Sequence, residues 1–140
     1  MRYLGLDLGS RTLGLSISDP NGILATSLGI IRHNEEYDKL VFEVKNIVED
    51  RKIDEIVLGL PKNMNNTIGP KGELSYKFKD ALESQLGIKV NLVDERLTTK
   101  QATDLLISND TSRKKRKKVI DSMAATIILQ SYLDMIKERQ

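Results

Sequence analysis

The fold of this chain is decided by two short segments at its start, residues 2–8 (RYLGLDL) and residues 12–18 (TLGLSIS). In both segments apolar residues alternate with small or polar ones, which is the period-two pattern of a β-strand. Residues 19–22 (DPNG) then supply turn chemistry, and residues 23–31 are predicted to form a third strand. Three strands with short connections predict an antiparallel meander.

Beyond residue 35 the pattern changes to helices that alternate with single strands. Short apolar runs predict strands at Ile53–Leu60 and Ile88–Val93, and Asn, Pro and Gly residues predict a loop over residues 61–72. Helical signals occur four times, and the predicted helices are residues 36–51, 74–86, 98–107 and 119–137. Because such units require right-handed crossovers between parallel strands, we expect an α/β fold. Its mixed five-stranded sheet would have the first three strands antiparallel and helices on both faces.

The composition is that of one soluble globular domain spanning residues 1–140. There is no cysteine and a single histidine, His33, to which the sequence assigns no role, so a thiolate or histidine zinc site is excluded and any metal would need oxygen ligands. No apolar stretch approaches the roughly 20 residues of a membrane span, and the N-terminus runs directly into a predicted strand. We therefore expect a cytoplasmic protein with no membrane partner.

One short segment concentrates the positive charge. The net charge is +2, yet residues 113–118 (RKKRKK) are all basic, so the rest of the chain is acidic overall. This run is expected just before the helix 119–137, where cations oppose the helix dipole. A polyanion lying across that end would offset the penalty, so the run favours binding of a nucleic-acid backbone.

Three acidic positions stand out against apolar surroundings. Asp7 lies in a predicted central strand, Asp94 and Glu95 end another strand, and Asp121 opens an apolar helix. A buried carboxylate is costly unless it is paired, hydrogen-bonded or bound to metal. Structural roles are the alternative: a turn contact for Asp7, a salt bridge with Arg96 for the pair, and the helix dipole for Asp121. Adjacent strand residues point to opposite faces, so these residues alone do not choose between Asp94 and Glu95.

Together the three acidic positions indicate a divalent-metal site. Carboxylate oxygens suit Mg²⁺ or Mn²⁺, which also bind phosphate groups. Two such ions about 4 Å apart activate a water molecule and stabilise the leaving oxygen in phosphodiester hydrolysis. The acidic residues and the basic run together therefore favour a nuclease.

Four blocks of sequence resemble the YqgF (RuvX-like) family of the ribonuclease H-like superfamily. The blocks are residues 5–11 (GLDLGSR), 59–61 (GLP), 94–99 (DERLTT) and 117–133 (KKVIDSMAATIILQSYL). They occur in family order and span nearly the whole chain. Asn65-Asn66 departs from the Asp-Gly that family members often carry, which concerns the loop after residue 61 and not the acidic residues.

The resemblance implies a ribonuclease H-like fold and a metal-dependent nuclease. It implies Asp7, Glu95 and Asp121 as the catalytic residues and as the ligands of Mg²⁺ or Mn²⁺, and so selects Glu95 over Asp94. Family members are described as nucleases for the 5′ end of pre-16S ribosomal RNA, which is a step of ribosome biogenesis. An older family label is Holliday junction resolvase. The residues expected to position the nucleic-acid backbone are Arg11, Arg96, Thr98, Lys117 and Lys118.

We therefore expect a hydrolase acting on ester bonds, with pre-rRNA favoured as its substrate. Three alternatives stay open. A resolvase would cut four-way DNA symmetrically and would be a dimer. A non-catalytic nucleic-acid-binding module would need the basic run but not the acids. Asp7-Leu8-Gly9-Ser10 also resembles the phosphate loop of actin-like sugar kinases, although these need two such domains to clamp ATP. The sequence does not decide the oligomeric state, the cleavage position, or endonuclease against exonuclease action.

Overall fold

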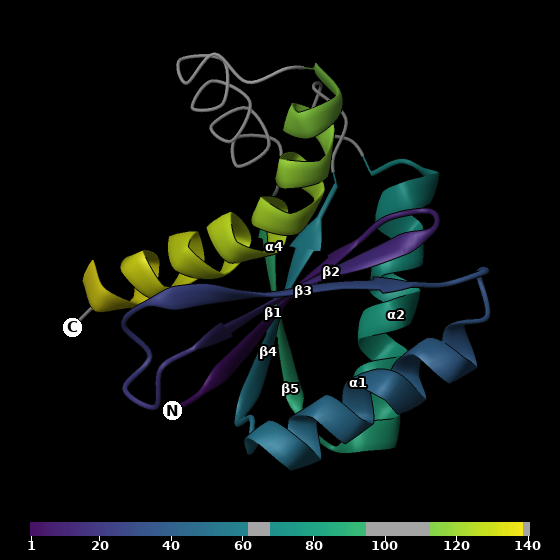
Figure 1. Cartoon of the computed structure of the whole chain (residues 1–140). Coiled ribbons are helices and arrows are strands. Elements are labelled where there is room, and N and C mark those ends of the chain that lie inside the picture. Colours follow the sequence, from purple (N-terminus) through teal and green to yellow (C-terminus); the bar gives the residue numbers. More distant parts are fainter. Residues whose placement is uncertain (62–67, 95–112, 139–140) are drawn as a thin grey trace.

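The computed structural model describes residues 1–61, 68–94 and 113–138, with side chains described up to residue 94 and from residue 123 to residue 137. Five strands form one mixed sheet in the order β3-β2-β1-β4-β5 (Figure 1). The strands are β1 (Tyr3–Leu8), β2 (Thr12–Ser18), β3 (Ala25–Arg32), β4 (Glu55–Leu60) and β5 (Lys89–Asp94). The described helices are α1 (Tyr37–Arg51), α2 (Pro70–Leu86) and α4 (Arg113–Glu138).

The antiparallel meander is confirmed. β1 pairs with β2 and β2 with β3, both antiparallel, and the Gly22 amide donates to the Asp19 carbonyl at 3.0 Å in the intervening turn. β3 starts two residues later than predicted because the Asp19 carboxylate accepts the amides of Ile23 and Leu24, at 2.7 and 2.8 Å. These two bonds extend the turn and delay the strand.

The parallel half of the sheet follows the predicted crossovers. β1 pairs with β4, and β4 with β5, all in parallel. The predicted loop 61–72 is too long, because α2 already begins at Pro70, and proline is favoured at the first position of a helix. The helix predicted over residues 98–107 lies outside the described residues.

The start of the last helix differs most from the prediction. α4 begins at Arg113 and not near Val119, so the basic run forms its first turns instead of a segment before it. Lysine and arginine are good helix formers, and the run continues into the apolar helix without a breaking residue. Asp121 therefore lies eight residues beyond the start of α4, too far from it for the helix dipole to explain this aspartate.

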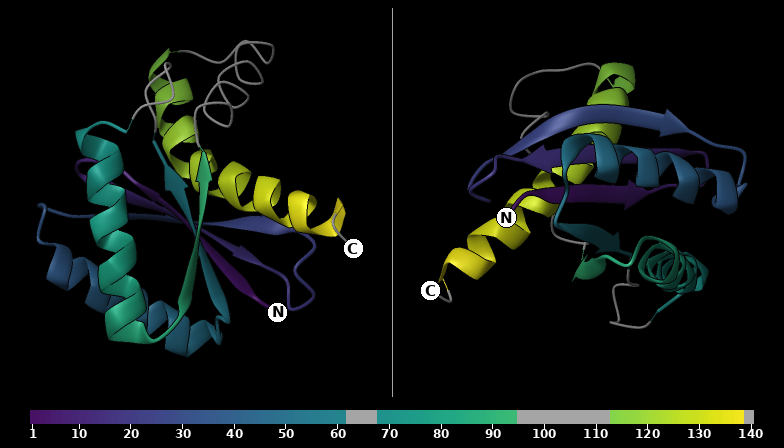
Figure 2. Two further views of the ribbon diagram at one scale, coloured as in Figure 1. Left: turned by 180° about the vertical axis from the view of Figure 1, so that it is seen from behind. Right: turned by 90° about the horizontal axis from the view of Figure 1, so that it is seen from below.

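Helices cover both faces of the sheet, as predicted (Figure 2). One face packs on α1 and α2 around a large apolar cluster that includes Leu4, Leu6 and Val44. The other face packs on α4 around a smaller cluster that contains Tyr3, Leu129 and other residues of the helix. None of the described helices has the length and apolar character needed to span a bilayer.

Candidate functional site

Asp7 lies near the carboxyl end of the central strand β1 and faces α4. Its neighbours Leu6 and Leu8 belong to the apolar cluster under α1 and α2. Side chains alternate along a strand, so the burial of these two leucines directs the intervening carboxylate to the opposite face. Asp7 itself is half-buried, and its partner on β2 is Gly14.

The backbone of α4 lies close to the sheet near Asp7. The buried Ser16 hydroxyl on β2 donates to the carbonyl of Ala125 at 2.7 Å. Gly5, on the same face of β1 as Asp7, has no side chain to hold the helix away. A Cβ atom there would lie 2.8 Å from Leu129 Cβ and 3.0 Å from the Ala125 carbonyl oxygen. The serine and the glycine together fix the height of α4 above the sheet.

The position of Asp121 on α4 follows from this contact. Tyr3, at the start of β1, packs with Leu129 and Leu133, whereas Gly5 lies against Ala125 and Leu129. Residues of β1 that are nearer to Asp7 therefore contact earlier turns of α4. Asp121 precedes Ala125 by four residues and shares its face of the helix. The structure describes the backbone of Asp121 but not its side chain, so its role as a ligand stays a prediction.

Asp94, the last residue of β5, lies on the opposite face of the sheet from Asp7. Leu92 packs in the cluster under α1 and α2, whereas Val93 packs in the cluster under α4. Alternation therefore places Asp94 on the face away from α4. Glu95 lies outside the described residues. Because β4 separates β5 from β1, the two strands are about 10 Å apart.

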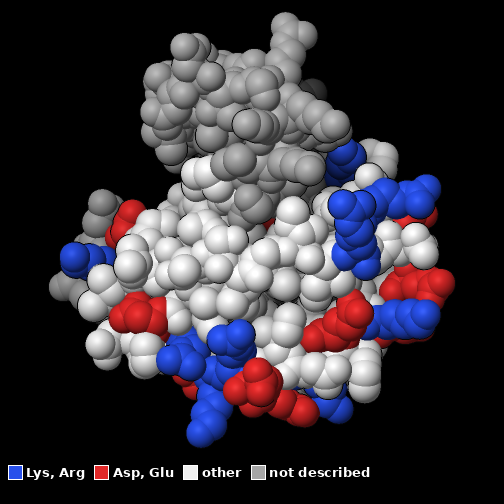
Figure 3. Space-filling view, viewed as in Figure 1, with Lys and Arg blue, Asp and Glu red and all other residues white. Residues whose placement is uncertain are grey.

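The predicted nucleic-acid contacts are described only in part. Arg11 is exposed in the turn between β1 and β2. Lys117 and Lys118 lie in the first turns of α4, but their side chains are not described, and Arg96 and Thr98 fall outside the described residues. On the face shown in Figure 3, basic and acidic side chains are interspersed over the described surface.

A metal cluster is not seen within the described part of the chain. No group of three or more acidic, histidine or cysteine side chains there could hold a metal ion. Of the predicted ligand set, only the side chain of Asp7 is described, so the full set stays a prediction.

Two carboxyl groups with a lowered pKa lie away from Asp7. Hydrogen bonds from the amides of Leu24 and Ile23 lower the pKa of Asp19, at the opposite end of the β1–β2 pair. The pKa of Glu83 on α2 is lowered by its hydrogen bond from Lys79 at 2.7 Å. Both groups therefore belong to the stability of the fold and not to the candidate site.

His33, to which the sequence assigned no role, contacts the loop beside the candidate site. Its ring Nε2 lies 3.0 Å from the carbonyl oxygen of Gly9, and its amide donates to the carbonyl of Arg11 at 2.9 Å. It therefore contacts the turn that follows Asp7. No sequence signal connects these segments, since 24 residues separate His33 from Gly9.

The strand order and the helix across the acid-bearing strand define the class: this is a protein with the ribonuclease H-like fold. A solved structure, T. thermophilus RuvC in complex with a Holliday junction substrate, matches with a TM-score of 0.59. It is 14% identical, and the match covers 96% of this chain and 96% of that chain. At this identity the likeness shows the fold alone.

Closer relatives identify the family. A sequence model of the RuvX family, described as Holliday junction resolvase, matches residues 1–135. A Bacillus cytotoxicus protein is 52% identical over 135 residues, covering 96% of this chain and 98% of that protein. A Bacillus subtilis protein is 52% identical over 137 residues, covering 97% and 99%. Both carry the name "Putative pre-16S rRNA nuclease".

The chain belongs to the RuvX family. It is therefore a hydrolase of the nuclease class, which acts on phosphodiester bonds. The family resemblance and the fold predicted from the sequence are both confirmed.

Proposed function

We propose that this chain is a metal-dependent nuclease that processes the 5′ end of precursor 16S ribosomal RNA in the cytoplasm. The names of its relatives support the substrate. One structural observation supports the proposed position of the site. Asp7 lies on the face of β1 that packs against α4. On this face Ser16 and Gly5 allow Ala125, which follows Asp121 by one helical turn, to lie close to the sheet.

The residues fit a hard divalent cation. The proposed donors Asp7, Glu95 and Asp121 are all carboxylates, which suits Mg²⁺ or Mn²⁺. Asp94 faces away from α4, which supports Glu95 as the donor from this segment. When bound, a pair of such ions supplies an activated water molecule and stabilises the leaving oxygen. Asp7 contributes a carboxylate held on a central strand, which keeps its position fixed.

The basic residues are proposed to hold the nucleic-acid backbone. Because α4 is helical from Arg113, Lys117 and Lys118 precede Asp121 by four and three residues and lie on its side of the helix. Exposed Arg11 follows the strand of Asp7 directly. Arg96 and Thr98 complete the proposed set. We expect these cations to bind phosphates that flank the cleaved bond.

A second candidate substrate is a four-way DNA junction, which the description of the family supports. The two substrates are separated by incubating the full chain and Asp7→Asn in Mg²⁺ with a precursor 16S 5′ fragment and with a synthetic junction. We expect cleavage of the RNA by the wild type alone. Cleavage of the junction alone would make the protein a resolvase. Binding without cleavage of either substrate would leave a non-catalytic module and contradict the proposal.

A further inference from the structure

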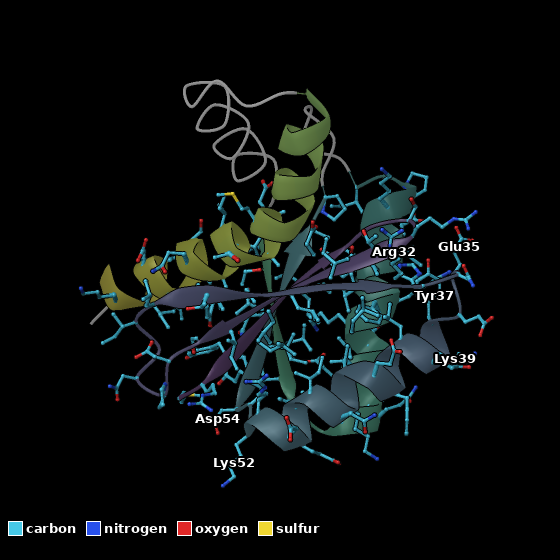
Figure 4. The ribbon with its side chains drawn as sticks, in the orientation of Figure 1. Arg32, Glu35, Tyr37, Lys39, Lys52 and Asp54 are labelled. Atoms are coloured by element: carbon cyan, nitrogen blue, oxygen red, sulfur yellow. The ribbon has the colours of Figure 1, made fainter. Side chains whose placement is uncertain are left out.

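His33 is placed to act on the turn beside Asp7. It directly follows β3, whose last residue Arg32 pairs with Thr12 at the start of β2. Its amide donates to the carbonyl of Arg11 at 2.9 Å, which continues the β2–β3 ladder into the β1–β2 turn. Figure 4 shows the neighbouring side chains of Arg32, Glu35 and Tyr37 gathered where β3 ends and α1 begins.

The hydrogen bonds of the imidazole fix its tautomer. Nε2 lies 3.0 Å from the carbonyl oxygen of Gly9, and the amide of Glu35 lies 3.1 Å from Nδ1. A carbonyl oxygen only accepts and a backbone amide only donates. The ring must therefore be neutral, with its proton on Nε2, for both bonds to form together. The ring of Tyr37, 5.8 Å away between centroids, packs beside the imidazole.

The turn that His33 holds is short and tightly closed. The Gly9 amide donates to the Thr12 carbonyl at 2.8 Å, and a Cβ atom on Gly9 would lie 3.1 Å from the Thr12 hydroxyl oxygen. Between these residues lies Arg11, with its side chain exposed. Since His33 binds the carbonyls of both Gly9 and Arg11, it fixes this turn at two points.

On the other side of the ring the backbone is held in an uncommon conformation. Glu35 has a φ of 65°, in the left-handed region that non-glycine residues seldom adopt. Its amide is the donor to His33 Nδ1. The ring therefore connects the start of α1 to the turn after Asp7 through hydrogen bonds on both nitrogens.

We propose that His33 is a positioning residue for substrate binding: its neutral imidazole holds the Gly9–Arg11 turn so that Arg11 meets a phosphate of the nucleic acid beside Asp7. The proposal rests on the proposed function for the role of Arg11 as a phosphate contact. His33 acts through Arg11 and does not itself touch the substrate.

The tautomer is tested first, without any substrate. His33 is the single histidine of the chain, so its ring gives one set of signals in a long-range ¹H–¹⁵N spectrum of the full protein. At neutral pH we expect the protonated nitrogen to be Nε2, the one coupled to both ring carbon-bound protons. A protonated Nδ1, or signals averaged between tautomers, would overturn the proposal.

Substrate binding is tested next with His33→Ala, His33→Gln and Arg11→Ala. The probe is a fluorescent RNA oligonucleotide from the precursor 16S 5′ end, and its Kd is measured at fixed salt. Loss of positioning hydrogen bonds should weaken binding about three- to ten-fold in His33→Ala. Glutamine can donate to Gly9 and accept from Glu35, so His33→Gln should restore most of the affinity. The matched control is Asn34→Ala, which changes the adjacent exposed residue and should bind as the wild type does.

A double-mutant cycle separates positioning from general destabilisation. If His33 acts through Arg11, His33→Ala should weaken binding no further in an Arg11→Ala background. A full additional loss in that background, or wild-type binding by His33→Ala, would overturn the proposal. Failure of the wild type to cleave RNA would instead contradict the proposed function, while the cycle measured by binding would still decide the role of His33.

Discussion

The two faces of β1 have different composition and different tasks. Toward α1 and α2 the strand presents Leu4, Leu6 and Leu8 to the larger apolar cluster. Toward α4 it presents Tyr3, then Gly5, and then Asp7, so apolar area falls toward the carboxyl end. The first face supplies the burial that stabilises the sheet. The second face buries less apolar area, because Gly5 and Asp7 take the place of large apolar side chains; this lets α4 lie close to the sheet beside the Asp7 carboxylate. Fold stability and the candidate site are thus divided between alternate residues of one strand.

The largest expected effect is on the polar face, at Asp7. Asp7→Asn keeps the shape of the side chain but removes its charge, so we expect cleavage to fall by about a thousand-fold or more. The free energy of unfolding should change by less than about 1 kcal/mol. Rates of cleavage in Mg²⁺ and urea unfolding measure the two quantities.

The control for this prediction lies on the opposite face of the sheet. Asp94→Asn replaces a carboxylate that faces away from α4 and should leave the cleavage rate within about two-fold of the wild type. If Asp94→Asn were the inactive variant and Asp7→Asn the active one, the assignment of the two faces would be wrong.

Adjacent residues of β1 offer the next comparison. Leu6→Ala opens a cavity in the larger cluster and should cost about 2–5 kcal/mol. Gly5→Ala places a methyl group against the Ser16 hydroxyl, Leu129 and the Ala125 carbonyl and should cost about 1–3 kcal/mol. Under conditions where both variants are folded, we expect Leu6→Ala to keep its kcat and Gly5→Ala to lose activity, because only Gly5→Ala displaces α4. If Leu6→Ala and Gly5→Ala lost activity in the same proportion to their loss of stability, the two faces of β1 would not differ in function.

A smaller change addresses the contact between Ser16 and α4. Ser16→Ala leaves the Ala125 carbonyl without this partner and should cost about 1–3 kcal/mol. We also expect Ser16→Ala to lower the rate of cleavage, because the helix turn next to Asp121 loses its hydrogen bond to the sheet. Ser75→Ala is the matched control: this buried serine lies on α2 and bonds within its own helix, at 3.2 Å to the Lys71 carbonyl. Ser75→Ala should lower stability without lowering kcat.

Local patterns were sufficient to predict most elements of the fold. The alternation in residues 12–18 predicted β2 with the bounds that the structure shows, and the helical spacing after residue 35 predicted α1 to within one residue. The start of α4 was missed because a run of lysines and arginines has no apolar periodicity, although these residues favour helix. Periodicity therefore located the buried segments but not a solvated end of a helix.

The candidate site could be predicted only in part, because it depends on contacts between distant segments. An aspartate in an apolar strand identified Asp7 from the sequence alone. The residues themselves did not decide between Asp94 and Glu95, because that depends on which face of β5 meets α4; the family resemblance selected Glu95, which stays a prediction. The bond from Ser16 to Ala125 spans 109 residues, and the bond from His33 to Gly9 spans 24. Neither leaves a pattern in the sequence, since hydroxyl and imidazole groups are as compatible with solvent as with a buried partner.

The smallest expected effect concerns a carboxylate at the other end of the same strands. Hydrogen bonds from the amides of Leu24 and Ile23 lower the pKa of Asp19 below its ordinary value of 3.8, so its ionised form is favoured by folding. This stabilisation is fully present above the unfolded-state pKa and is lost as pH falls through the folded-state pKa. The wild type should therefore lose its advantage in unfolding free energy over Asp19→Asn as pH decreases from about 5 to about 2. Cleavage at neutral pH should be unchanged in Asp19→Asn, because Asp19 lies at the end of the β1–β2 pair opposite Asp7. A constant difference across this pH range would contradict the stabilising role of Asp19, and a loss of cleavage would contradict its separation from the site.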